Sequence, residues 1–175
     1  MFAMMEKSYR IRQSFLIPLT LDGVLLFILI VMSLFTESHP TERIILILFF
    51  VPLVFFVIEA RMRRIIIGSD GLALKKFFKT KSIRWGDITN VDTVIVGKKA
   101  YLAMTTVKGF YVISNSYEKF SRLVDDIVGQ LDGDKVEERV RNIIAQPPVK
   151  RSDIVGAWVI ALLMAAILYV KIFVA

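Results

Sequence analysis

The sequence predicts a membrane α-helical protein with three spans and a small α+β soluble domain between the second and third spans. Three observations support this fold class. The 175-residue chain is 55% hydrophobic, against about 45–50% for an ordinary soluble domain. The apolar residues gather in two blocks near the N-terminus and one at the C-terminus, each about 20 residues long, which is the length that crosses a bilayer. The segment between the second and third blocks has the mixed composition of a water-soluble fold.

The first two spans are expected at about residues 14–35 and 41–60. The few residues between them allow only a tight turn, so they form a helical hairpin within an N-terminal region of residues 1–60. A soluble domain is then expected at residues 61–149, and the C-terminal segment 150–175 supplies the third transmembrane helix.

Basic residues flank all three spans on the same predicted side of the membrane. Short cytoplasmic segments of membrane proteins are enriched in Lys and Arg. The N-terminus and the middle domain are therefore expected in the cytoplasm and the C-terminus outside, in a multi-pass protein of the cell inner membrane. The residues that carry this prediction are Lys7, Arg10, Arg12, Arg61, Arg63, Arg64, Lys150 and Arg151.

Short apolar runs separated by glycine-containing turns follow the second span. Between residues 65 and 113 this pattern predicts six or seven antiparallel strands. Trp85 alternates with Ile83 in one of these strands, so we expect its side chain to be largely buried. From Tyr117 to Leu131 the apolar residues recur at three- and four-residue steps, which predicts an amphipathic helix.

Ser116 precedes this helix and is the expected N-cap, because serine side chains satisfy the first backbone N–H groups of helices. A second amphipathic stretch covers residues 136–145 and ends before Pro147.

Three segments of the middle domain resemble a known family. They are the hairpin Ile65–Leu74, the segment Ile83–Val91 with its hydrophobic-x-Trp-x-Asp-Ile-x-x-Val pattern, and Ile113–Asn115 before the helix. Over residues 61–132 the sequence resembles the bacterial PH-like (pleckstrin-homology-like) domains of small membrane proteins of unassigned role. The resemblance implies a PH-like antiparallel β-barrel or sheet capped by a C-terminal amphipathic helix. It does not imply phosphoinositide binding, because a tight turn at Ser69–Gly71 replaces the long basic loop of lipid-reading PH domains.

The side-chain inventory argues against most enzyme chemistry. The chain has no Cys and one His, which excludes thiolate chemistry and disfavours a histidine-based zinc site. We therefore expect no enzyme activity and no catalytic residue, cofactor or metal. The formal net charge is +7, but the basic residues occur at membrane ends without a nucleic-acid-binding motif, so nucleic acid is not an expected partner.

A basic and aromatic segment is the first candidate surface, for the membrane or for a partner. Four lysines surround two phenylalanines in Lys75, Lys76, Phe77, Phe78, Lys79 and Lys81. One interpretation is contact with anionic lipid headgroups, which attract such a loop. The other is a strand with one Phe in the core and solvated lysines.

Two acids and a stripe of small residues are the remaining candidates. Asp22 and Glu59 lie in the first two spans at similar distances from the hairpin turn, either as a functional intramembrane pair or as interfacial groups paired with arginines. Ala157, Ala161 and Ala165 repeat at every fourth residue of the third span. This small face suits close helix packing, either within the chain or with a second copy or another membrane subunit.

These features predict a non-catalytic, membrane-tethered PH-like scaffold or interaction module, or an accessory subunit of a larger membrane complex. Its expected partners are the lipid bilayer with its anionic headgroups, and a second copy of the chain or another membrane subunit. The alternative is a transport or ion-handling component that uses Asp22 and Glu59.

The orientation of the spans is directly testable. A topology reporter fused after Ala175 should report the outer side, and one inserted near Gly133 should report the cytoplasm, because the basic flanks all favour that arrangement. A reporter after Ala175 that remains cytoplasmic would contradict the third span.

Overall fold

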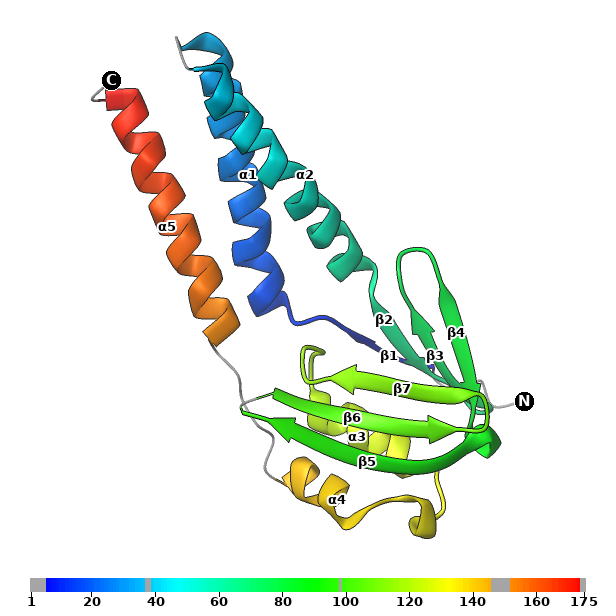
Figure 1. Ribbon diagram of the computed structural model, residues 1–175. Coiled ribbons are helices and arrows are strands. Elements are labelled where there is room, and N and C mark those ends of the chain that lie inside the picture. Colours follow the sequence, from blue (N-terminus) through cyan, green and yellow to red (C-terminus); the bar gives the residue numbers. More distant parts are fainter. Residues whose placement is uncertain (1–5, 37–38, 98, 146–151, 174–175) are drawn as a thin grey trace. The chain divides into compact units, whose positions relative to one another are not determined.

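The computed structural model in Figure 1 describes residues 6–36, 39–97, 99–145 and 152–173. The chain divides into two compact units. One contains three long helices. The other, the two-sheet unit, combines the N-terminal segment, up to Arg12, with the chain from Met62 to the last described residue before the third long helix.

The helical unit consists of α1 (Gln13–Phe35), α2 (Pro40–Met62) and α5 (Ser152–Phe173). All three helices are long and apolar enough to cross a membrane, which confirms the prediction of three candidate spans. Their bounds differ from the predicted ones by at most two residues at the ends that the structure describes, and residues 174–175 of the third predicted span lie outside the described part.

Aromatic side chains and a buried stripe hold the helices together. Rings of α1 and α2 meet in two pairs, Phe15 with Phe56 at 6.4 Å between centroids and Phe27 with Phe50 at 5.9 Å. On α1 the buried residues recur at steps of three or four, which places them on one face. They are Pro18, Asp22, Leu26, Leu29 and Ser33.

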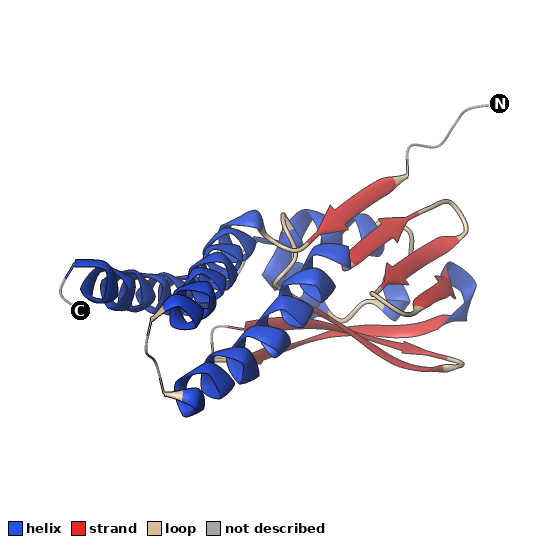
Figure 2. Cartoon of the chain, turned by 90° about the horizontal axis from the view of Figure 1, so that it is seen from above, coloured by secondary structure: helices blue, strands red, loops and turns tan. Residues whose placement is uncertain are grey.

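The two-sheet unit contains two antiparallel sheets. The first has the strand order β1 (Lys7–Arg10), β2 (Arg64–Ile67), β3 (Gly71–Lys75) and β4 (Thr80–Arg84). The second has the order β5 (Ile88–Val96), β6 (Lys99–Thr106) and β7 (Gly109–Ser114). Figure 2 shows the two sheets as separate groups of red arrows. A single 3-10 turn, η1 (Trp85–Asp87), connects them.

The N-terminal segment is part of the two-sheet unit. The sequence analysis placed residues 1–60 outside the domain, whereas the structure pairs Lys7–Arg10 with Ile67–Arg64 as the first strand of the four-stranded sheet. A strand of four residues carries too weak a periodic signal to be recognised alone, and its partner lies more than fifty residues away in the sequence. The folded domain therefore needs chain from both sides of the helical hairpin.

One continuous core joins the two sheets to α3 (Phe120–Val128) and α4 (Glu138–Ala145). Both amphipathic helices were predicted, although each is shorter than the sequence pattern indicated. The largest fully buried side chains come from five strands and both helices, and include Ile65, Leu72, Ile88, Leu102, Ile113, Leu123 and Ile143.

The start of α3 differs from the prediction. Lys119, with a φ of 50°, takes the N-cap position and makes no side-chain capping hydrogen bond. Ser116 is instead held by tertiary pairing, because its carbonyl accepts the N–H of Arg12 at 3.1 Å. Two residues further along, the backbone N–H of Glu118 donates to the carbonyl of Arg10 at 2.8 Å. Contact with the N-terminal segment thus moves the helix start by several residues.

Trp85 and Gly71 fix the junction between the sheets. Trp85 is half-buried rather than largely buried, packs against the core and donates its indole N–H to the carbonyl of Gly68 at 3.1 Å. A Cβ atom at Gly71 would lie 2.1 Å from the carbonyl oxygen of Ile83 on β4. Only glycine therefore permits this close approach of β3 and β4.

Gly71→Ala is expected to lower the free energy of unfolding by about 1–3 kcal/mol, because the backbone of β4 must move to accept the methyl group. The matched control is Gly86→Ala, since a Cβ there meets no atom within 4 Å. The measurement is urea unfolding of the full chain in detergent, followed by Trp85 fluorescence in a Trp158→Phe background, which leaves one of the two tryptophans. Equal effects of the two glycine substitutions would contradict the close approach.

Candidate functional site

The basic and aromatic segment forms the tip of the β3–β4 hairpin. Lys75 is paired with Thr80 at the last position of the ladder, and the backbone N–H of Lys76 donates to the carbonyl of Lys79 at 2.9 Å. The residues between the two strands are therefore a closed loop, and the interpretation of this segment as a continuous strand is wrong.

The two phenylalanines at this tip do not enter the core. Phe78 is 77% exposed, while Phe77 is half-buried and lies outside the core cluster. Their rings meet edge to face with centroids 4.2 Å apart. The loop thus presents an aromatic pair to the outside, and the expectation that one Phe would pack in the core is wrong.

Four exposed lysines surround the aromatic pair, namely Lys75, Lys76, Lys79 and Lys81. The Nζ of Lys81 lies 5.2 Å from the centre of the Tyr111 ring, which is the geometry of a cation–π contact between β4 and β7. We call the six residues 75–79 and 81 the basic hairpin.

Strand register places the basic hairpin at a defined end of the four-stranded sheet. Arg10 pairs with Arg64, Arg64 with Lys75, and Lys75 with Thr80. α1 begins three residues after Arg10, and α2 ends two residues before Arg64. The basic hairpin therefore extends from one particular end of the sheet. At this end β1 leads into α1, and β2 follows α2.

Asp126 on α3 anchors β1, the first strand of this sheet. Its Oδ1 accepts a hydrogen bond from the Nζ of Lys7 at 2.7 Å, and its Oδ2 accepts one from the hydroxyl of Tyr9. Burial raises the pKa of Tyr9, and the hydrogen bond to the Asp126 carboxylate raises it further. Burial opposes ionisation of Asp126, but the bonds from Lys7 and Tyr9 outweigh it and lower the pKa of this carboxyl group. A neutral phenol, an ammonium and a carboxylate thus tie β1 to α3.

The two intramembrane candidates are not equivalent. Asp22 is 2% exposed, whereas Glu59 is half-buried and close to the end of α2. Asp22 lies thirteen residues before the end of α1, and Glu59 nineteen residues after the start of α2. At 1.5 Å per residue their depths below the hairpin turn differ by about 9 Å. The helix bounds therefore contradict the expectation of a shared depth, because the turn lies nearer in sequence to Asp22 than assumed.

The small-residue face of the third span packs within the chain over part of its length. Ala157 and Ala161 are buried, and α5 packs against α1. Ala165 is exposed, since the less exposed residues continue instead at Met164, Leu168 and Lys171. The contact follows the 3.6-residue period of the helix rather than a strict four-residue step.

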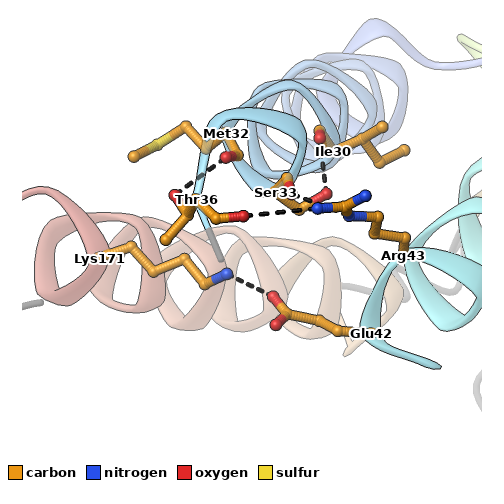
Figure 3. A network of polar contacts seen from close by, with 7 residues as sticks. All are labelled: Ile30, Met32, Ser33, Thr36, Glu42, Arg43 and Lys171. Atoms are coloured by element: carbon orange, nitrogen blue, oxygen red, sulfur yellow. Dashed lines mark hydrogen bonds and ion pairs between the residues drawn. The ribbon is translucent and has the colours of Figure 1, made fainter. Parts of the chain in front are cut away.

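A polar network that the sequence analysis did not identify joins the end of α1, the start of α2 and the last turns of α5 (Figure 3). Arg43 of α2 donates its Nε–H to the carbonyl of Ser33 on α1 at 2.9 Å, and Glu42 forms an ion pair with Lys171 of α5. The available signal was the presence of opposite charges at the start of α2 and late in α5. This network fixes the register of the three helices at that end.

The sequence analysis also did not identify an exposed apolar surface on the three-stranded sheet. The outer face of the three-stranded sheet exposes apolar side chains on two strands, with Val94 47%, Phe110 63% and Val112 51% exposed. The signal was the uninterrupted apolar run in β7, which lacks the polar alternation of a strand with one solvated face. Among the residues that the structure describes, no group of three or more acidic or histidine side chains is arranged to hold a metal ion.

A family model described as "Family of unknown function (DUF6585)" matches residues 3–127, which is most of the 175-residue chain. The chain belongs to this DUF6585 family. The match covers the helical hairpin, both sheets and nearly all of α3, and it ends before α4 and α5. Searches of curated proteins and of solved structures found no match.

Asp126→Asn is expected to lower the free energy of unfolding at pH 7 by about 1–3 kcal/mol, because hydrogen bonds to a charged group are lost. The folded-state pKa of Asp126 is lowered, so its contribution is complete above the unfolded pKa of about 4 and disappears as the pH falls further. The stabilities of the wild type and Asp126→Asn should therefore converge in acid. The measurement is urea unfolding across pH with Trp85 fluorescence.

The matched control for this substitution is Asp125→Asn, at the exposed neighbouring position on α3. It should change stability by less than about 0.5 kcal/mol. A loss as large as that of Asp126→Asn would contradict the anchoring role of Asp126.

Proposed function

We propose that the protein is a non-catalytic, membrane-anchored interaction module of the cell inner membrane, whose PH-like cytoplasmic domain contacts anionic lipid through the basic hairpin. The observation that carries this proposal is the register of the four-stranded sheet, which puts the hairpin at the sheet end that continues into α1 and α2.

The pairing of β1 with β2 supports the proposed topology. These strands precede α1 and follow α2, and they belong to one sheet. If α1 and α2 cross the membrane, both ends of their hairpin must therefore lie on the same side. The basic residues on these two strands and next to the helices favour the cytoplasmic side for that sheet.

The order of elements supports the PH-like assignment. Two antiparallel sheets with short connections are followed by the amphipathic helix α3, whose buried residues complete the core. The tight turn between β2 and β3 at Ser69–Asp70 argues against a deep headgroup pocket of the phosphoinositide-binding kind. Contact with lipid would instead use charge and one inserted aromatic ring.

Simple energetics favour a weak but useful contact. Each lysine close to an anionic leaflet contributes about 1 kcal/mol. Insertion of the largely exposed Phe78 ring would add to this through burial of apolar surface. A few kcal/mol would be a weak membrane anchor for a free soluble domain, but it suffices to orient a domain already tethered by helices, because tethering raises the effective concentration of the surface.

The exposed apolar face of the three-stranded sheet supports the interaction part of the proposal. Apolar side chains gathered on a solvated sheet face are typical of a surface that another protein covers. The module would in this way join a membrane subunit or soluble protein to the bilayer, as an accessory component of a larger assembly.

The lipid contact is testable with a single cysteine, because the natural chain contains none. We expect an environment-sensitive dye on Phe78→Cys to show a blue-shifted emission in nanodiscs of anionic lipid and a smaller shift in neutral lipid. The shift should decrease as salt is raised, since ions screen the lysine charges. Replacement of the four hairpin lysines by Gln should abolish the difference between the two lipids.

Two controls separate this contact from general attraction. Ser69→Cys carries the dye at the opposite end of the four-stranded sheet and should report water in both lipids. Replacement of four other exposed basic residues by Gln removes the same charge and should leave the Phe78→Cys signal unchanged; the set is Lys99, Lys119, Arg139 and Arg141. A hairpin signal that is the same in anionic and neutral lipid would overturn the proposal.

A further inference from the structure

Asp22 is a carboxylic side chain buried inside the helical unit. It is 2% exposed in the protein alone, and its Oδ1 makes no hydrogen bond with any residue that the structure describes. Buried side-chain oxygens almost always have a partner. The exception at Asp22 needs a physical explanation.

The position of Asp22 is in the middle of the helix packing. It lies at the centre of the buried stripe of α1, with Pro18 on one side and Leu26 on the other. It is nine residues from the start of α1, and buried Ala161 is nine residues from the start of α5. These two helices run in the same direction (Figure 1), so both residues are about 14 Å along their helices.

The polar network of Ser33, Glu42, Arg43 and Lys171 independently supports this alignment of α1 with α5. Ser33 lies twenty residues after the start of α1, and Lys171 nineteen after the start of α5. Adjacent residues of α2 bind both, because Arg43 donates to the carbonyl of Ser33 and Glu42 pairs with Lys171. Asp22 and Ala161 therefore lie at the same level, close to half of the about 30 Å hydrocarbon core.

Charged groups of the packed helices all lie away from this level. On α5 the titratable side chains are Asp153, Tyr169 and Lys171, and on α2 they are Glu42, Arg43, Glu59 and Arg61. All of these lie in the first or last few residues of their helices. Within the described helices, no cation is thus available at the depth of Asp22 to balance a negative charge.

We propose that Asp22 is a proton-binding site that holds a neutral carboxylic acid in the contact between α1 and α5. An unpaired carboxylate in an apolar interior is very unfavourable, and the group avoids this cost by taking up a proton. The step is the transfer of one proton from water to a carboxylate oxygen, with no other bond changed. A single carboxylate oxygen without neighbouring free ligands is a poor site for a metal cation, which needs several oxygens.

The small side chains of α5 make the contact between α1 and α5 sensitive to the protonation of Asp22. Ala157 and Ala161 allow the two helices to approach closely, so little space remains for water around the carboxyl group. Loss of the proton would put a bare negative charge into this contact and drive α1 and α5 apart or draw water between them. The charge state of Asp22 therefore sets the strength of the α1–α5 contact, independently of the basic hairpin.

The experiment uses the full chain in lipid nanodiscs. Infrared spectra near neutral pH should show the C=O stretch of a protonated carboxylic acid, which disappears in Asp22→Asn and persists in Glu59→Gln and Asp153→Asn. Because the folded state binds the extra proton, wild-type stability must fall as pH rises. Between pH 5 and pH 9 the melting temperature of the wild type should fall by about 2–4 °C or more relative to Asp22→Asn.

Three results would overturn the proposal. They are the absence of a protonated carboxyl band in the wild type, identical pH profiles for the wild type and Asp22→Asn, and a band or melting temperature that depends on Na⁺ or K⁺ at constant pH. The infrared measurement on the wild type needs no variant, and Asp22→Glu with a retained band replaces Asp22→Asn if the latter fails to fold.

Discussion

Backbone pairing between β1 and β2 is the constraint on which the rest of this structure depends. It joins the chain before α1 to the chain after α2 in one sheet, so the helical hairpin is an insertion into the two-sheet unit rather than an attachment to its end. The sheet then determines where the β3–β4 loop lies. Asp126 reinforces the same pairing from α3, through bonds to Lys7 and Tyr9.

The distribution of charge follows from the two environments of the chain. Exposed lysines and arginines lie on the strands and loop that are next to the helices in sequence, where their long side chains remain hydrated. Inside the helical unit charge is tolerated near the helix ends, where Glu42 and Lys171 neutralise each other. Asp22 is buried without a counter-charge among the described residues of the three helices, so its surroundings differ from those of the paired Glu42.

The basic hairpin shows how far a local pattern can be interpreted. Lysines on both sides of two adjacent phenylalanines indicated a surface with an aromatic component, and the exposed Phe78 agrees with that description. The same pattern was equally compatible with a strand, because a period of two and a short loop differ by only a few residues. The pairing of Lys75 with Thr80 shows that the residues between them form a loop and not a strand. This pairing depends on the position of β4.

The sequence by itself determined the three long helices, the run of short strands and the two amphipathic helices, because length, hydropathy and periodicity are properties of contiguous residues. Only the tertiary structure decided that residues 7–10 complete the sheet, that α3 starts at Phe120, and that Asp22 and Glu59 lie at different depths. Each of these depends on contacts between segments far apart in the chain or on the position of a turn. Such contacts carry no local period, so they become visible only when the chain is folded.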